Sequence, residues 1–162
     1  MERRQFLKNG YASGLAAAVV PRVVGGSEQK PGTASGGEIR AITPEGAPKP
    51  AGAYSQAIAA GGFVFISGHV PRDPHTQEVL KGDITVQTER VMENLKIILE
   101  AAGLSFDRAV KTTVYLQDMG DFDAMNRVYG RYFTASPPAR VVVEVARLHA
   151  GAHIEIDLIA RA

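Results

Sequence analysis

The 162-residue sequence predicts an α+β domain in which two helices cover one face of a mixed β-sheet. Two segments carry apolar residues at spacings of three and four, as amphipathic helices do. The segments around them are rich in β-branched and aromatic residues, and one alternates in polarity as a strand does. A composition of 45% apolar and 22% charged residues is typical of a single globular domain. The predicted order of elements is β-β-α-β-α-β-β.

The predicted sheet begins with a hairpin. A short Pro- and Gly-rich stretch within residues 42–60 leads into the run Tyr54-Ser-Gln-Ala-Ile, and Phe63-Val-Phe-Ile-Ser follows across Gly61-Gly62. Paired glycines between two β-prone runs favour a tight turn. We therefore expect two antiparallel strands, the first of which presents Tyr54.

The first predicted helix is marked at both ends. Asp83 is suited to cap its N-terminus, and Gly103 is suited to the position just beyond its C-terminus. The expected buried positions recur at helical spacing: Ile84, Thr88, Val91, Leu95, Ile98, Leu99 and Ala102.

A second helix is expected further along the chain, with Asp121 as its cap and Gly130 inside it. Its apolar residues again step at helical spacing, and Asn126 lies beside this stripe. The stripe consists of Phe122, Met125, Tyr129, Tyr132 and Phe133. The run Ser136-Pro-Pro ends the helix, because proline cannot continue it.

Three further strands are predicted at residues 110–116, 140–146 and 154–161. In the first, one side carries Val110, Val114 and Leu116, and the other carries Lys111 and Tyr115. In the second, one side carries Val141, Val143 and Val145, and the other carries Val142, Glu144 and Ala146. Neither side reads as fully solvated, and about 120 ordered residues cannot supply a second internal layer. We expect self-association to cover the open face of the sheet.

The first 37 residues have the features of a targeting signal followed by a flexible linker. Arg3, Arg4, Phe6, Leu7 and Lys8 match the twin-arginine pattern R-R-x-F-L-K, and a short apolar run follows. We therefore expect residues 1–26 to be a twin-arginine signal peptide, residues 27–37 a flexible linker, and residues 38–162 the folded domain, exported to the periplasm. The alternative for the start is a disordered basic tail. The apolar run is too short to span a bilayer, so no membrane association is expected apart from export.

Composition and spacing exclude several function classes. The net charge is +1 and the basic residues are scattered, so no nucleic-acid partner is expected. The chain has no cysteine, which excludes disulfides and thiolate chemistry. His149 and His153 have the spacing of a helical metal pair, but Ala150-Gly-Ala between them predicts a turn. We expect no metal site.

Many short motifs together resemble the RidA/YjgF family of reactive intermediate deaminases. They are Ala53-Tyr-Ser-Gln-Ala-Ile, Ile66-Ser-Gly-His-Val-Pro, Gln87-Thr with Asn94-Leu, Ala101-Ala-Gly-Leu, Val110-Lys-Thr-Thr-Val-Tyr-Leu, Asp121-Phe with Asn126 and Tyr129, Pro138-Ala-Arg, Val143-Glu-Val-Ala-Arg-Leu and Ile154-Glu-Ile. The resemblance implies a chorismate-mutase-like fold and a homotrimer with sites between subunits. It also implies hydrolysis of 2-imino acids and their enamine tautomers to 2-keto acids and ammonia, without a cofactor.

The resemblance assigns the site residues. Arg140, after Pro-Ala, matches the family's signature arginine, and its planar guanidinium suits a substrate carboxylate. Glu155 matches the family's acidic residue, suited to activating water and protonating the departing nitrogen. Tyr54 would offer its hydroxyl at the pocket border. Asn126 would hold substrate or the facing loop, and Gly68 would let the backbone approach the ligand.

Structural alternatives exist for these residues. Arg140 could be paired with Glu144 or Glu155, Glu155 could be a solvated strand residue, and Tyr54 could belong to the core. A different function is also open, namely a non-catalytic small-carboxylate-binding or chaperone-like protective module of the cell envelope. Ribonuclease activity is ascribed to some members of the family, but the sequence shows no basic groove or aromatic cluster that would support it.

The sequence departs from the family pattern at the expected cleft. The residues that differ are Ala53, His69, Val141, Val142 and His149, and the loop 136–138 is shorter than usual. Valines beside the arginine predict a drier pocket with an altered substrate range.

Overall fold

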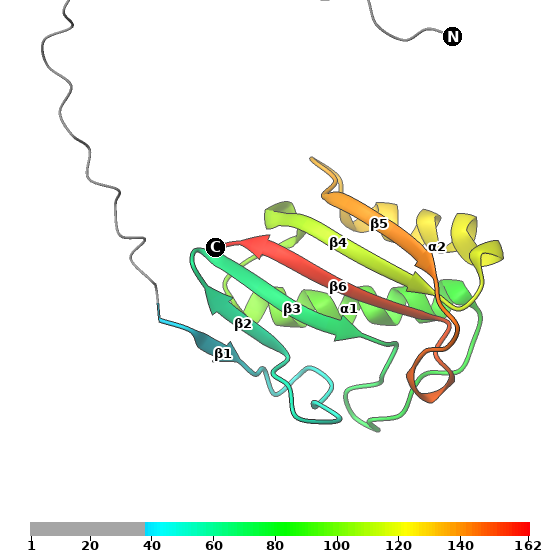
Figure 1. Cartoon of the computed structure of the whole chain (residues 1–162), viewed down its shortest axis with the longest axis horizontal. Helices are drawn as coiled ribbons and strands as arrows, with labels where there is room; N and C mark the ends of the chain where they lie inside the picture. The colour runs from blue at the N-terminus through cyan, green and yellow to red at the C-terminus, as the bar shows by residue number, and fades with distance from the viewer. Residues whose placement is uncertain (1–37) are drawn as a thin grey trace, which may run out of the picture. The chain divides into compact units, whose positions relative to one another are not determined.

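The computed structural model describes residues 38–162, in which two helices pack on one face of a six-stranded mixed sheet (Figure 1). The elements are β1 (Arg40–Ile42), β2 (Ala57–Ala60), β3 (Phe63–His69), α1 (Ile84–Ala101), β4 (Ala109–Leu116), α2 (Phe122–Tyr129), β5 (Ala139–Glu144) and β6 (Ile154–Arg161). The strand order is β1-β2-β3-β6-β4-β5, and β4 and β5 run parallel while the other neighbours are antiparallel. The predicted fold class is confirmed. The predicted signal peptide and linker lie outside the described residues.

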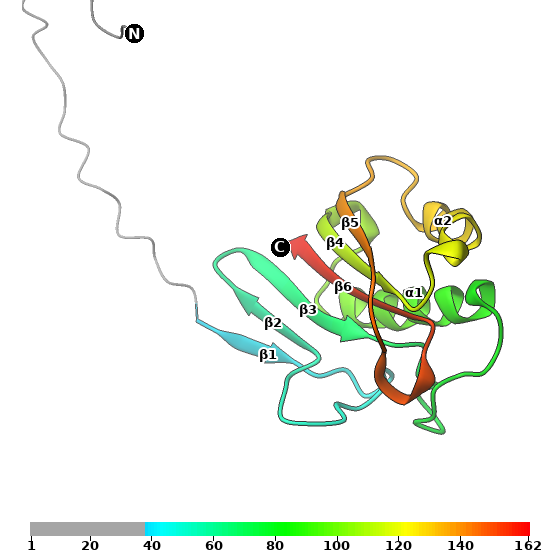
Figure 2. The same ribbon diagram turned by 45° about the vertical axis from the view of Figure 1, so that its right-hand side comes forward.

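The core lies between the sheet and the helices, which cover one side of it in both views (Figures 1 and 2). The residues predicted at helical spacing along α1 are buried, apart from Ala102, which packs against the core at the end of the helix. They meet alternate residues of the central strands, among them Val114, Ile156 and Leu158. Each such buried aliphatic side chain contributes roughly 1.5–3 kcal/mol. In the described residues, no helix combines the length and apolar character needed to cross a membrane.

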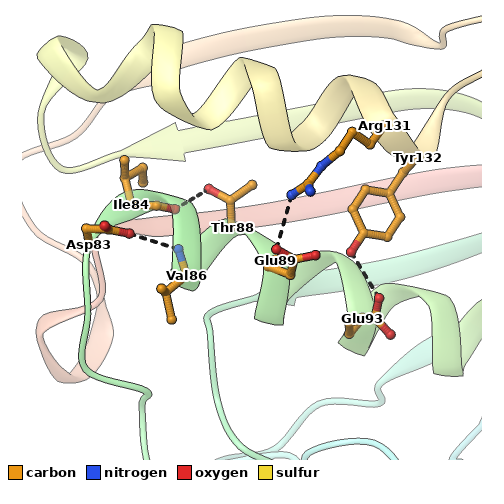
Figure 3. Close-up of polar contacts among 8 residues, drawn as sticks. All are labelled: Asp83, Ile84, Val86, Thr88, Glu89, Glu93, Arg131 and Tyr132. Carbon is orange, nitrogen blue, oxygen red and sulfur yellow. Dashed lines mark hydrogen bonds and ion pairs between the residues drawn. The ribbon is translucent and has the colours of Figure 1, made fainter.

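A side-chain contact caps the N-terminus of α1, and two others join the helix to the segment after α2 (Figure 3). The Asp83 carboxylate accepts a hydrogen bond from the backbone N–H of Val86 at 3.0 Å. Gly103 has a φ of +73°, as the position after a helix often requires. Further along, Arg131 pairs with Glu89 at 3.1 Å, and the Tyr132 hydroxyl donates to Glu93 at 2.9 Å. Both predicted helix boundaries are confirmed.

The hydrogen bond between Asp83 and the N–H of Val86 leads to a testable prediction. Asp83→Ala is expected to lower the free energy of unfolding by about 1 kcal/mol, because it leaves an N–H of the first turn without its partner. Urea denaturation would measure the loss. The matched control is Asp107→Ala, since Asp107 is exposed and is not the cap of its short helical turn. An equal loss in both variants would show that the cap is not the cause.

The beginning of the sheet differs from the prediction in two ways. An additional edge strand, β1, pairs with β2. It is too short to show a period in the sequence. The predicted first strand was also placed too early, because β2 begins at Ala57 and Tyr54 lies in the preceding loop. There the N–H of Tyr54 donates to the carbonyl of Gly52 at 2.9 Å. This hydrogen bond closes a turn, so Tyr54 does not pair with a neighbouring strand.

The start of β4 also differs from the prediction. Val110 was expected beside Val114, yet it is 41% exposed, because the pairing of β4 with β6 shifts register between Ala109 and Lys111. Past the shift, Thr112 and Val114 face the core.

The second helix is shorter than predicted. It ends at Tyr129, with Gly130 as its C-cap and Tyr132 in a following 3₁₀ turn. Asp121 precedes it as expected but makes no side-chain cap hydrogen bond. The Asp118 carboxylate instead caps a 3₁₀ turn by accepting from the N–H of Gly120.

The face of the sheet opposite the helices exposes large apolar side chains. On β3 these are Phe63 and Phe65, whose rings lie 6.4 Å apart, and on β5 they are Val141 and Val143. In each strand they alternate with residues that face the helices. Monomers rarely leave such a patch uncovered, so the face has the character of an interaction surface.

Candidate active site

A cavity of about 430 Å³ lies at the end of β3, between the loop before β2 and the start of β6. It brings together three of the five residues predicted for the site, Tyr54, Gly68 and Glu155. Its other lining residues are Pro48, Lys49, Ala51, Gly52, Ser67, His69, Val70, Arg72 and His149. Arg140 and Asn126 are not among the lining residues.

Glu155 reaches the cavity because of strand alternation. Its neighbours Ile154 and Ile156 are fully buried under the helices, so the Glu155 side chain points to the opposite face. Its carboxyl group lies directly against Gly68, where a Cβ would overlap Oε1 and would lie 3.0 Å from Cδ. The pairing of β3 with β6 shifts register between Ile66 and His69, which places Gly68 in a bulge. The absent side chain of Gly68 therefore makes room for Glu155, rather than only for a ligand as predicted.

The surroundings of Glu155 suit proton transfer. Burial raises the pKa of its carboxyl, the negative charge of Asp157 raises it further, and His149 lowers it. Asp157 in turn accepts a hydrogen bond from the Tyr115 hydroxyl at 3.0 Å. A half-buried carboxyl with a raised pKa is a better proton acceptor than an ordinary carboxylate and can return the proton later. The alternative of a fully solvated strand residue is wrong.

This contact predicts the effect of a single methyl group. Gly68→Ala is expected to lower the free energy of unfolding by about 1–3 kcal/mol, because the added Cβ forces the Glu155 carboxyl out of its position. Urea denaturation measures this loss in the free energy of unfolding. The control is Gly130→Ala, where a Cβ meets nothing within 4 Å and the backbone is helical. That change should be neutral or stabilising by up to about 1 kcal/mol, and a similar loss in both proteins would contradict the steric explanation.

Tyr54 borders the cavity from the loop before β2. It is 47% exposed, so the alternative that it belongs to the core is wrong. Its hydroxyl oxygen accepts a hydrogen bond from the N–H of Ala51 at 3.1 Å. The hydroxyl proton remains free to be donated to a water or a substrate.

Arg140 lies on edge strand β5, on the face that α2 covers. Its guanidinium carbon lies 4.6 Å from the centre of the Tyr129 ring and 5.8 Å from that of Phe122. Asn126 is exposed on α2, between these two aromatic residues in sequence. Within residues 38–162 of one chain, Arg140 forms no salt bridge with Glu144 or Glu155. The stacked guanidinium keeps its donors available for an anion.

Arg140 and Glu155 lie apart within one chain. Arg140 is in register with Thr112 of β4, which is in register with Leu158 of β6, three residues from Glu155. Two strand spacings and three residues amount to about 14 Å between the Cα atoms. The side chains also point to opposite faces, since Thr112 is buried under α2 with its hydroxyl 2.8 Å from that of Tyr129. Within one chain, the two residues predicted for the site therefore do not meet.

His69 is a pocket residue whose position the sequence marked only as a departure from the family pattern. It is 6% exposed, and burial lowers the pKa of its imidazole to about 4. A backbone hydrogen bond with Gln56 acts in the opposite direction and raises this pKa. Its Nε2 atom is buried without a hydrogen-bond partner in the described part of the chain. The available signal was Gly68 directly after the predicted strand, because a glycine beside a strand can indicate a bulge.

The two C-terminal histidines do not form a helical pair. His149 lies in a short 3₁₀ turn, and His153 lies beyond it, immediately before β6. The backbone N–H of His153 donates to the Gln87 side chain at 2.8 Å. Among residues 38–162, no cluster of three potential metal ligands occurs.

Known proteins resemble this chain in sequence over most of the residues that the structure describes. The family model described as Endoribonuclease L-PSP matches residues 44–162. The RutC family protein PH0854 of Pyrococcus horikoshii is 59% identical over 119 residues, which cover 74% of this chain and 94% of that protein. The 2-iminobutanoate/2-iminopropanoate deaminase of Mus musculus is 40% identical over 121 residues, which cover 75% of this chain and 90% of that protein.

A solved structure shows the same fold. The structure of E. coli TdcF with bound serine matches with a TM-score of 0.73 and 38% sequence identity, covering 76% of this chain and 98% of that chain. The residues that match the family model include every strand and helix on which Arg140, Asn126, Gly68 and Glu155 lie. On this evidence the chain belongs to the RidA/YjgF family, whose sequence model is described as endoribonuclease L-PSP.

Proposed function

We propose that this protein hydrolyses reactive 2-imino acids and their enamine tautomers to 2-keto acids and ammonia, without a cofactor. The observation that carries the proposal is the half-buried Glu155 carboxyl with a raised pKa, held in a cavity beside the free hydroxyl proton of Tyr54. The mouse relative named as a 2-iminobutanoate/2-iminopropanoate deaminase supports the same chemistry.

The proposed reaction needs one base that later serves as an acid. The Glu155 carboxylate accepts a proton from a water molecule while the oxygen of that water attacks C2 of the iminium. The carboxyl then returns the proton to the nitrogen of the tetrahedral adduct. The C2–N bond breaks and ammonia leaves, while the adduct hydroxyl gives its proton to the Glu155 carboxylate as the keto group forms. That proton then passes to the released ammonia, which leaves as ammonium and restores the carboxylate. Tyr54 orients the water or the adduct through its hydroxyl proton.

The substrate carboxylate requires Arg140, which in this proposal comes from a neighbouring copy. A neighbouring copy that packs on the sheet face opposite the helices would bury the exposed apolar side chains there, which are Phe63, Phe65, Val141 and Val143. Its edge strand β5 would present Arg140 at the rim of the cavity, and Asn126 would lie on the same rim. We therefore propose a homotrimer with one site at each subunit boundary.

Turnover tests the proposal directly. An amino-acid oxidase supplies 2-iminobutanoate, and the purified protein is expected to accelerate keto-acid release over the spontaneous rate. Glu155→Gln should remove the acceleration, whereas Glu100→Gln, on the exposed side of α1, should retain it. If the parent protein binds keto acids but accelerates nothing, the deaminase proposal fails and the small-carboxylate-binding module takes its place.

A further inference from the structure

Two cations from two different loops line the cavity. Lys49 lies in the loop before β2, and Arg72 lies just after β3, and both line the cavity that contains Glu155. Glu155 is the single carboxylate among the lining residues. Within the described chain, neither Lys49 nor Arg72 has an acidic partner within 4.0 Å. The positive charge at this end of the cavity is therefore unbalanced.

Gln77 holds the two loops together. Its side-chain Oε1 accepts a hydrogen bond from the backbone N–H of Lys49 at 2.9 Å, and its backbone carbonyl accepts one from the Arg72 guanidinium. Gln77 adopts a φ of +64°, which is uncommon for a residue with a side chain. Such a conformation costs about 1–3 kcal/mol and persists where the surrounding contacts impose it. Gln77 therefore holds the Arg72 guanidinium and the backbone of Lys49 close to each other beside the cavity.

We propose that Lys49 and Arg72 form a second anion-binding subsite, and that the substrates of this protein include 2-imino acids with a second, distal carboxylate. The inference rests on the proposed function. The neighbouring Arg140 binds the C1 carboxylate, Glu155 acts at C2, and the distal carboxylate lies between Lys49 and Arg72. The guanidinium retains donors beyond the one used by Gln77 and can accept a carboxylate by a charge-assisted fork.

The size of the cavity is consistent with this substrate class. At about 430 Å³ it lies within the range of pockets that enclose drug-sized ligands, which leaves room beyond a small monocarboxylic imino acid. A neutral aliphatic tail at this end would leave two cations facing it without a counter-charge. A carboxylate there supplies the counter-charge, and its pairing with the partly buried Arg72 is stronger than in bulk water.

The test compares two imines that differ in the distal carboxylate. An L-aspartate or L-glutamate oxidase supplies a dicarboxylic imine, and an oxidase acting on 2-aminobutanoate supplies 2-iminobutanoate. The parent is expected to show a higher kcat/KM for the dicarboxylic imine. Arg72→Gln and Lys49→Gln should each lower that kcat/KM at least about tenfold more than the value for 2-iminobutanoate. Arg72→Lys should retain part of the preference, because it keeps the charge.

The controls separate this proposal from folding and from catalysis. Lys96→Gln, on the exposed side of α1, should leave both values at the parental level. A parental preference for 2-iminobutanoate, or equal losses for both imines in Arg72→Gln, would overturn the subsite. Thermal shift with 2-oxoglutarate and 2-oxobutanoate tests binding without turnover. If neither imine is turned over but 2-oxoglutarate stabilises the parent more strongly than Arg72→Gln, the subsite stands and the deaminase proposal fails.

Discussion

A mixture of Arg140→Ala and Glu155→Gln subunits is expected to recover about a quarter of parental turnover, although each variant alone is inactive. The two side chains point to opposite faces of the sheet, and their Cα atoms lie about 14 Å apart. A site that uses both must therefore take them from different subunits. Loss of a catalytic acid or base costs about 10²–10⁴-fold in rate, so recovery stands well above the background of either variant.

The expected fraction follows from the geometry of a closed ring. Each boundary needs an intact Glu155 on one side and an intact Arg140 on the other. In an equal random mixture each condition is met with a probability of about one half, so about a quarter of the boundaries are complete. The variants are unfolded together, refolded and assayed for keto-acid release from 2-iminobutanoate.

Two controls define the result. Arg140→Ala mixed with the double variant Arg140→Ala/Glu155→Gln contains no intact Arg140 and should recover nothing. The variants refolded separately and then combined briefly should also stay inactive until subunits exchange. If the co-refolded mixture has the parental size yet no activity, each chain must complete its own site, and the division of the site between two subunits would be wrong.

Much of this arrangement follows from local sequence features. The helix α1 was predicted at both ends because Asp83 and Gly103 mark them and because its apolar period is long. Alternation in β6 places Glu155 opposite Ile154 and Ile156, which the sequence Ile-Glu-Ile already indicates. The pocket face of Glu155 was therefore predictable without the structure.

Other features depend on contacts between distant segments. The register shift that exposes Val110 depends on the pairing of β4 with β6, which is distant in sequence. The bulge at Gly68 likewise arises where β3 meets β6. The strand order β3-β6-β4-β5 separates Arg140 from Glu155, and no local pattern specifies that order. The family resemblance identified both residues as site residues, but it did not show how far apart they lie within one chain.

His69 should make the stability of this protein strongly dependent on pH between about 4 and 6.5. Burial lowers the pKa of His69 from 6.5 to about 4 in the folded protein. In this window the unfolded chain binds a proton that the folded protein does not, so stability falls as the pH falls. A difference of this size corresponds to about 3 kcal/mol, lost progressively from pH 6.5 down to pH 4.

Urea denaturation of the parent and of His69→Gln at pH 7 and pH 4 measures this contribution. The parent should lose about 3 kcal/mol more than the variant, because glutamine binds no proton in the unfolded chain. Glu155 acts in the opposite sense, since its raised pKa gives stability that is lost as the pH rises through the folded value. Both proteins retain Glu155, so its effect cancels in the comparison. His75→Gln, which changes an exposed histidine, should follow the parent. Parallel pH profiles for the parent and His69→Gln would mean that the buried imidazole is protonated in the folded protein.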